Sequence, residues 1–238
     1  MGSRAGHPGL KRLLAALLWL AVPAAAQDVL PGLRGGVRVP ADLDHGAFRA
    51  LLRVQTELGV KCTGFMVAPA IAMTAAHCLY LGRVGRFIQP GSVHVLLGYR
   101  LGAYRAHARV RRFVIASGYD PAHAIATIGE DRAVLLLDHA IADAGSILPV
   151  AAVPSGGRVA VRVAAYDQDR AEIALASPPC ALTGSVRDAT GAAVLTQDCS
   201  ITHGASGAPL VAVIDGHDSA VGMVVAGAAA SNLAVPLK

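Results

Sequence analysis

Three short stretches of the sequence contain the residue types that can turn a serine hydroxyl into a nucleophile. His77 follows Thr-Ala-Ala, Asp131 stands directly before an apolar run, and Ser206 lies in Gly-Ala-Ser-Gly-Ala-Pro-Leu. A serine hydroxyl is a poor nucleophile at neutral pH, so it needs a base within hydrogen-bond reach. Histidine suits that task because it takes up and returns a proton near neutral pH, and a buried carboxylate holds its ring in the required tautomer. We therefore predict that these three residues act together.

The glycines beside Ser206 predict a tight turn that stabilises negative charge. Attack of a hydroxyl on a carbonyl creates an oxyanion, which needs hydrogen-bond donors aimed at it. The backbone N–H groups of Gly204 and Ser206 are predicted to supply these donors if the turn curls around the oxygen. Glycine permits such a turn and lets a substrate backbone approach closely.

The elements that must position these residues are short strand-like runs, since helical periodicity is hard to find. Gly, Pro, Asp or Ser stands near most of the run boundaries, and 215–219 has the composition of a hairpin turn. Many short strands at fairly regular intervals predict an all-β sandwich or barrel. The turn-rich stretch 149–157 is the predicted junction between two halves. The predicted strands are 49–56, 62–67, 93–97, 109–115, 133–137, 159–165, 173–176, 192–196, 209–214 and 220–225.

Residues 1–26 have the composition of an export signal. Three basic residues precede the apolar run Leu13–Val22, and Ala24–Ala26 offers a small-residue cleavage site. The apolar run is shorter than the roughly 20 residues that span a bilayer, and an uncleaved membrane anchor is the alternative. We expect a secreted or periplasmic protein with no membrane contact after signal removal.

Composition predicts a folded protein without a nucleic-acid partner. Hydrophobic residues make up 54% of the chain and charged residues 16%, which is enough apolar material for a core. The formal net charge is +5, but the predicted signal holds three basic residues and no acidic one, which leaves +2. That small excess, with no stripe of basic and aromatic residues, gives little attraction for a polyanion.

The four cysteines predict disulfides rather than a metal site. An even number behind an export signal is typical of proteins from an oxidising compartment. Three pairings are possible, and the order along the chain favours two local loops, Cys62–Cys78 and Cys180–Cys199. The sequence contains neither a C-x2-C pair nor an H-E-x-x-H motif, so no metal ligand set is predicted.

Together, the motifs resemble the signatures of the trypsin/chymotrypsin family of serine peptidases, in its bacterial or glutamyl-endopeptidase-like branch. Thr-Ala-Ala-His-Cys at 74–78 and Gly-Ala-Ser-Gly-Ala-Pro-Leu at 204–210 carry this resemblance, and the order His, Asp, Ser is also that of the family. Weaker likenesses are Cys-Thr-Gly-Phe at 62–65, Tyr-Asp-Pro at 119–121 and Asn-Leu-Ala-Val-Pro at 232–236.

This resemblance implies an all-β fold of two six-stranded antiparallel β-barrels of the chymotrypsin type, with the active site between them. The N-terminal barrel, 27–148, would supply His77 and Asp131, and the C-terminal barrel, 149–238, would supply Ser206. Strand residues Val225, Ala226 and Gly227 would pair with the substrate backbone. By residue count, Ser200 falls near the base of the specificity pocket, and His203 is assigned to its wall, with an ordinary loop histidine as the alternative.

Two departures from the family pattern carry information. Digestive members have an aspartate directly before the serine, which pairs with a new N-terminus after cleavage of the precursor, and this chain has Ala205 there. That pairing cannot form, so trypsin-style activation is not expected. Asp198 is the carboxylate nearest to the counted pocket position, which neither supports nor excludes a preference for Arg or Lys.

The predicted activity is that of a secreted serine endopeptidase forming an acyl-enzyme on Ser206, with a polypeptide substrate and a monomeric state. This chemistry requires no metal or organic cofactor. The alternative is a protease-like binding protein or a latent precursor with little activity. An α/β-hydrolase esterase is excluded, because the G-x-S-x-G pattern ends in Ala208 and the only later histidine is His217 on a predicted hairpin.

Overall fold

The computed structural model of the chain describes residues 1–2, 32–34, 36–227 and 231–238. Nearly all of the predicted export signal at 1–26 lies outside the described residues. Strands and short 3-10 helices make up the regular structure of the described part, which contains no helix long and apolar enough to cross a membrane.

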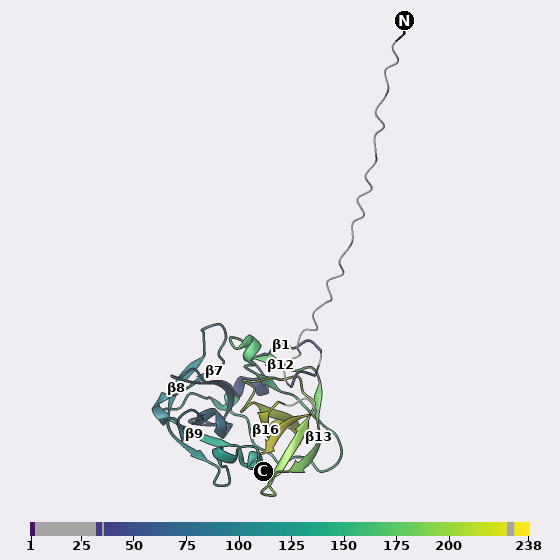
Figure 1. Cartoon of the computed structure of the whole chain (residues 1–238). Coiled ribbons are helices and arrows are strands. Elements are labelled where there is room, and N and C mark those ends of the chain that lie inside the picture. The colour runs from purple at the N-terminus through teal and green to yellow at the C-terminus, as the bar shows by residue number, and fades with distance from the viewer. Residues whose placement is uncertain (3–31, 35, 228–230) are drawn as a thin grey trace.

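One half of the molecule is a closed barrel of six antiparallel strands (Figure 1). The strand order is β2-β3-β4-β9-β8-β7, with hairpins joining β2 to β3, β3 to β4, and β7 to β8. The 3-10 helices Ala76–Leu79 and Ile128–Glu130 lie at the ends of this barrel's strands. The six strands are β2 (Leu51–Thr56), β3 (Lys61–Ala68), β4 (Ile71–Thr74), β7 (Val93–Leu97), β8 (Ala106–Ile115) and β9 (Ala133–Leu137).

The other half is a six-stranded antiparallel sheet in the order β10-β13-β14-β17-β16-β15. A bridge between Arg162 and Val211 joins the two ends of the sheet, with N–H to O distances of 2.8 and 2.9 Å, so the sheet nearly closes. The prediction of two six-stranded antiparallel barrels is confirmed. The strands are β10 (Val159–Val161), β13 (Cys180–Arg187), β14 (Ala193–Gln197), β15 (Pro209–Ile214), β16 (His217–Ala226) and β17 (Asn232–Pro236).

The predicted hairpin turn at 215–219 is shorter in the structure. Asp215 and Gly216 form a two-residue connection between β15 and β16, with φ angles of 51° and 79°. Positive φ at both positions is typical of a type I′ turn, whose twist matches that of the flanking strands.

Two smaller sheets accompany the barrels. One consists of β1 (Val39–Pro40), β12 (Leu175–Ala176) and β11 (Ala164–Ala165), and the other is a ribbon of β5 (Tyr80–Leu81) and β6 (Arg86–Phe87).

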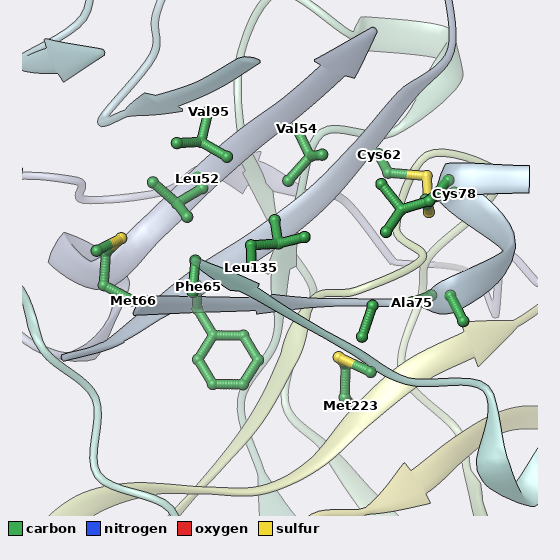
Figure 2. Close-up of a cluster of buried hydrophobic side chains, with 14 of the residues drawn as sticks. Leu52, Val54, Cys62, Phe65, Met66, Ala75, Cys78, Val95, Leu135 and Met223 are labelled. Carbon is green, nitrogen blue, oxygen red and sulfur yellow. A yellow bond between two sulfur atoms is a disulfide. The ribbon is translucent and has the colours of Figure 1, made fainter. Parts of the chain in front are cut away.

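Alternating strand residues fill the closed barrel with apolar side chains (Figure 2). Leu52, Val54 and Phe65 are essentially inaccessible to solvent, and each such side chain stabilises the fold by about 1.5–3 kcal/mol when buried. Met223 from β16 of the other sheet belongs to the same apolar cluster. The two barrels therefore share a continuous core instead of meeting only through polar surfaces.

Both predicted disulfides are present. Cys62 of β3 is bonded to Cys78, which lies in the 3-10 helix that carries His77. Cys180, at the start of β13, is bonded to Cys199, which follows β14. These bonds close loops with sequence separations of 16 and 19 residues. Because each bond restricts the unfolded chain, each stabilises the folded state by about 3 kcal/mol.

The described residues within 32–40, which we call the N-terminal arm, run along the second barrel. Ile201 N–H and the Asn232 side chain donate to Gly32 O at 3.3 and 3.0 Å. Farther along the arm, Val39 and Pro40 pair with β12. The chain thus contacts the second barrel before it enters the first at Leu51, although the predicted N-terminal barrel, 27–148, includes the arm.

Glu172, which precedes β12, joins this second half to the first barrel. Its carboxylate accepts hydrogen bonds from the Tyr99 hydroxyl and from Arg53 of β2, the latter at 3.1 Å. The Arg53 guanidinium also lies 4.1 Å above the Tyr99 ring centre and is almost completely buried. The hydrogen bonds from Tyr99 and Arg53 lower the pKa of Glu172 from 4.5 to about 2. The ion pair with Glu172 therefore stabilises the joint between the barrels, and the cation–π contact orients Arg53 from within the first barrel.

We predict that Glu172→Gln lowers the free energy of unfolding at pH 7 by about 1 kcal/mol, the order expected for a half-exposed ion pair. Because the folded-state pKa lies below that of the unfolded chain, the ionised carboxylate stabilises the fold above pH 4.5, and this stabilisation is lost as the pH falls toward about 2. Urea unfolding at pH 7 and pH 2.5 measures the difference.

Glu57→Gln is the matched control, since the Glu57 side chain has the same 51% exposure and its contacts to Arg109 and His94 are longer, at 3.8 and 3.5 Å. We expect little change in this variant at either pH. An equal loss in both variants, or a Glu172→Gln deficit that persists undiminished at pH 2.5, would contradict the assignment.

Candidate active site

His77 is held in place from both sides along the chain. β4 ends at Thr74, and the following Ala75 and Ala76 are completely buried, so only small side chains fit there. Cys78 on the other side is fixed to β3 by its disulfide. His77 lies between these anchors at the first turn of a 3-10 helix, with its side chain partly exposed.

Asp131 accepts two hydrogen bonds from the same residue. It follows the 3-10 helix Ile128–Glu130, precedes β9 and is 4% exposed. Its Oδ2 lies 2.6 Å from His77 Nδ1, and its Oδ1 accepts the backbone N–H of His77 at 2.9 Å. A buried carboxylate bonded in this way holds the Nδ1–H tautomer and leaves His77 Nε2 free to accept a proton.

Ser206 completes this chain of contacts from the second barrel. Its Oγ lies 2.9 Å from His77 Nε2, and its carbonyl accepts the N–H of Thr63 in β3 at 2.9 Å. Gly207 has a φ of 88°, and a Cβ atom on it would lie 2.1 Å from Thr63 O. Glycine is therefore required at this position for the loop that carries Ser206, residues 204–207, to reach the first barrel; we call it the serine loop. The structure brings together all three residues that the sequence analysis selected.

The Gly204 and Ser206 N–H groups are free to bind an oxyanion, because neither donates to any acceptor among the described residues. Gly204 has a φ of 91°, and a Cβ on it would lie 2.3 Å from Tyr166 O. The Gln168 N–H donates to His203 O at 2.6 Å. Because the C=O of His203 and the N–H of Gly204 belong to one trans peptide and point in opposite directions, this bond turns the Gly204 N–H away from Gln168.

A cavity of about 300 Å³ opens beside Ser206. His203 lies in its wall. The pairing of β15 with β16 ends at Met223, so 225–227 extend past β15 along the cavity. Burial, and the nearby charge of Asp131, raise the pKa of Tyr119 above its ordinary value. The lining residues are His77, Tyr119, Ala124, Ile125, Ile128, Asp131, Thr202, His203, Ser206, Val224, Val225, Ala226 and Gly227.

Ser200 and Asp198 lie outside this cavity, which corrects the position obtained by counting residues. Ser200 is buried, and its Oγ accepts the N–H of Arg34 from the N-terminal arm at 3.3 Å. Asp198 accepts the Ala181 N–H and forms an ion pair with Arg158. The disulfide from Cys199 to Cys180 fixes this segment to β13, the Ile201 N–H bonds it to Gly32 of the arm, and the wall of the cavity begins only at Thr202.

Within the described residues, the one grouping with metal-ligand proximity does not fit a metal ion. It consists of Cys62, His77 and Cys78, whose ligand atoms lie within 4.8 Å of one another. Both sulfur atoms belong to the disulfide, so neither is available as a thiolate, and the His77 nitrogens are bonded to Asp131 and Ser206.

Two buried residues at this site had no predicted role. Thr63 donates its hydroxyl to Gly204 O at 2.8 Å and accepts the Tyr166 N–H at 3.0 Å. Asp167 is completely buried and accepts the Thr202 N–H at 2.9 Å. A polar residue next to a cysteine in an apolar strand was the one available signal for Thr63, and nothing in the local sequence marks Asp167 as buried.

Comparison with known proteins agrees with this architecture. The chain is similar to a Glu endopeptidase solved in complex with MPD, with a TM-score of 0.71 and 18% identity over 86% of this chain and 93% of the other. It is also similar to human heparin binding protein, with a TM-score of 0.61 and 19% identity over 84% of this chain and 90% of the other. A search of curated proteins gives no significant match. The family model for trypsin matches residues 38–236, and the chain therefore belongs to the trypsin family.

Proposed function

We propose that the protein is a secreted serine endopeptidase that hydrolyses peptide bonds through an acyl-enzyme on Ser206. The observation that carries this proposal is the unbroken series of contacts from Asp131 through His77 to Ser206, at 2.6 and 2.9 Å. Membership of the trypsin family supports it, because that family implies polypeptide substrates. The two disulfides suit an oxidising compartment, which agrees with the predicted export signal.

In the first half of the proposed reaction, Ser206 Oγ attacks the carbonyl carbon of the scissile peptide while His77 Nε2 takes its proton. The oxyanion that forms accepts hydrogen bonds from the N–H groups of Gly204 and Ser206, and Asp131 stabilises the imidazolium of His77. The imidazolium then gives its proton to the departing amine nitrogen. The C–N bond breaks and leaves an ester on Ser206.

In the second half, water replaces the departed amine and His77 acts again as the base. It takes a proton from the water, whose oxygen attacks the ester carbonyl, and the oxyanion returns to the same two donors. Collapse of this intermediate returns the proton to Ser206 Oγ and releases the carboxylic acid product. The nucleophile, base and donors all come from the chain itself.

The shape of the cavity supports an extended substrate. Residues 225–227 run past the end of β15, where a substrate strand can pair with their backbone. Apart from Asp131, which is bonded to His77, the described lining residues include no carboxylate. A Lys or Arg side chain entering the cavity would therefore find no acidic partner among them.

We predict that a fluorophosphonate probe labels the purified parent protein but neither Ser206→Ala nor His77→Ala. Removal of the nucleophile abolishes the covalent bond, and removal of the base leaves Ser206 unactivated. Ser185→Ala, which changes an exposed serine of β13, is the control and should label like the parent. A folded parent that stays unlabelled would favour a protease-like binding protein or a latent precursor.

We predict that Gly204→Ala lowers kcat about 100-fold and changes KM little, because the substitution displaces one oxyanion donor. The added Cβ would collide with Tyr166 O. Gly59→Ala is matched in backbone conformation, since Gly59 has a φ of 87°, but its Cβ would meet no atom within 4 Å. Steady-state kinetics should show the loss only in Gly204→Ala, and parental kcat in that variant would remove Gly204 from the proposed donor pair.

We predict that peptides with an uncharged residue before the scissile bond are cleaved with at least a roughly 10-fold higher kcat/KM than the same peptides with Arg there. A buried cation without an acidic partner is poorly bound. A series of fluorogenic peptides that differ only at this residue (Ala, Leu, Arg and Glu) measures the preference. Faster cleavage after Arg would show that a carboxylate outside the described lining residues pairs with the Arg side chain of the substrate.

A further inference from the structure

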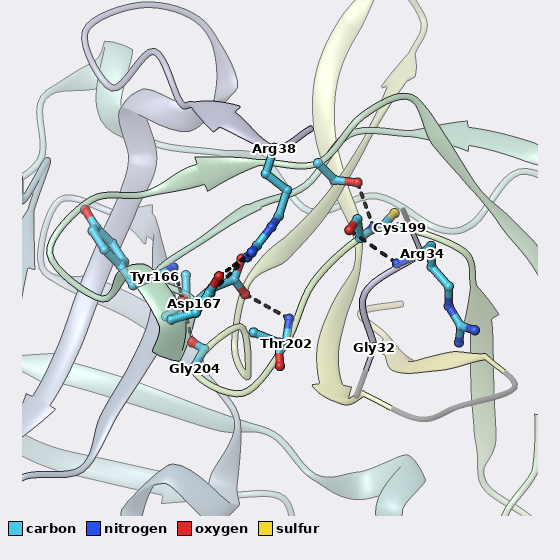
Figure 3. A network of polar contacts seen from close by, with 12 residues as sticks. Gly32, Arg34, Arg38, Tyr166, Asp167, Cys199, Thr202 and Gly204 are labelled. Carbon is cyan, nitrogen blue, oxygen red and sulfur yellow. Dashed lines mark hydrogen bonds and ion pairs between the residues drawn. The ribbon is translucent and has the colours of Figure 1, made fainter. Parts of the chain in front are cut away.

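A buried carboxylate beneath the oxyanion loop, residues 202–204, takes no part in the reaction described above. Asp167 has no exposed side-chain surface. Figure 3 shows its carboxylate between Arg38 and Thr202. Its Oδ1 accepts the Thr202 N–H at 2.9 Å, and its Oδ2 lies 2.5 Å from Arg38 Nη1 of the N-terminal arm. A charge is buried at such a position only if it is paired and hydrogen-bonded.

The charged groups around Asp167 come from the arm and from its own segment. The Arg38 guanidinium is 11% exposed and also pairs with Asp169, at 2.5 Å. The hydrogen bond from Arg38, and to a smaller extent the charge of the neighbouring Arg170, lower the pKa of Asp169. Burial raises the pKa of Asp167 to about 6, while the Thr202 N–H and the charge of Arg38 act in the opposite direction. Arg38 is thus the cation in contact with this buried carboxylate.

Segment 166–168 holds the oxyanion loop through three separate links. Asp167 accepts from Thr202, Gln168 N–H donates to His203 O, and Thr63 Oγ1 bridges the Tyr166 N–H and Gly204 O. The second link fixes the peptide that carries the Gly204 N–H. Asp167 supplies the one ionic member of this set, so its charge state and position affect the whole loop.

We propose that Arg38 is a positioning residue: by pairing with the buried Asp167, it holds the oxyanion loop with the Gly204 N–H available to the substrate. This inference rests on the proposed peptidase function and adds the device that orders its oxyanion site. Position 205 is alanine, so the residue directly before Ser206 supplies no carboxylate that could hold the loop through an ion pair. The cation is a side-chain guanidinium, and the contact therefore needs no free amino terminus.

Kinetics of Arg38→Gln provides the first test. We expect kcat to fall at least about 10-fold with KM within about 2-fold of the parent, because donor alignment matters in the transition state more than in the bound substrate. Arg49→Gln is the control: it removes an ion pair of similar length but greater exposure, Arg49–Asp143 at 2.6 Å, which connects the 3-10 helix Ala47–Ala50 with Asp143 and is not part of the cavity lining. Its kcat should match that of the parent.

Rescue variants separate a positioning role from a general loss of stability. Arg38→Lys keeps the charge and should recover part of kcat. The double variant Arg38→Gln/Asp167→Asn should return kcat to within about 3-fold of the parent, because an amide oxygen still accepts the Thr202 N–H and no unpaired charge remains buried. Parental kcat in Arg38→Gln, or a double variant no better than Arg38→Gln, would overturn the proposal.

Amide hydrogen exchange at Thr202 and Gln168 tests the loop without reference to peptidase activity. Both N–H groups should exchange about 10-fold or more faster in Arg38→Gln, and return toward parental rates in the double variant. Unchanged exchange in a folded Arg38→Gln would overturn the proposal whatever the activity of the parent. An inactive parent with the expected exchange pattern would instead refute the peptidase function and leave the role of Arg38 in ordering the loop intact. If Arg38→Gln does not fold, Arg38→Lys and the double variant decide by the same measurements.

Discussion

The contact between β3 of one barrel and the serine loop of the other is the constraint on which the site depends. Ser206 and His77 belong to different barrels, yet their side chains must meet within hydrogen-bond distance. Thr63 sets that distance, since its N–H binds Ser206 O, its hydroxyl binds Gly204 O, and its carbonyl accepts from Thr74. Gly207 makes the approach possible, because any larger residue would separate the two surfaces.

Other features of the fold support this docking from different directions. The shared apolar cluster that contains Met223 lies between the barrels, Glu172 joins them at the Arg53 side, and the N-terminal arm is bonded to the second barrel near Thr202. Each contact alone contributes on the order of one to a few kcal/mol. Their separation in space matters more than their sum, because contacts at several points suppress rotation of one barrel against the other. The catalytic geometry is therefore a property of the whole interface.

Much of the fold and the central site could be predicted from the sequence, because local patterns carry them. Short apolar runs predicted most strands, and the residues around His77 and Ser206 marked both halves of the site. β4 and β13 were missed: β4 is a four-residue strand that runs directly into the histidine motif, and β13 is interrupted by polar and glycine residues. The roles of Thr63 and Asp167 depend on partners more than 100 residues away, which no local pattern encodes. Ser200 was misplaced because counting residues ignores the disulfide that fixes its segment.

The position of the N-terminal arm in the chain affects when the site is completed. Arg38 precedes both barrels, whereas Asp167 lies 129 residues later, so their contact forms only after the second half of the chain is in place. Contacts that close such long loops are formed late in folding. A chain that has built only its first barrel holds His77 and Asp131 but lacks the serine and its supporting loop. The proposed hydrolytic activity therefore requires the second barrel, and a chain that has built only its first barrel has no nucleophile with which to cleave neighbouring polypeptides.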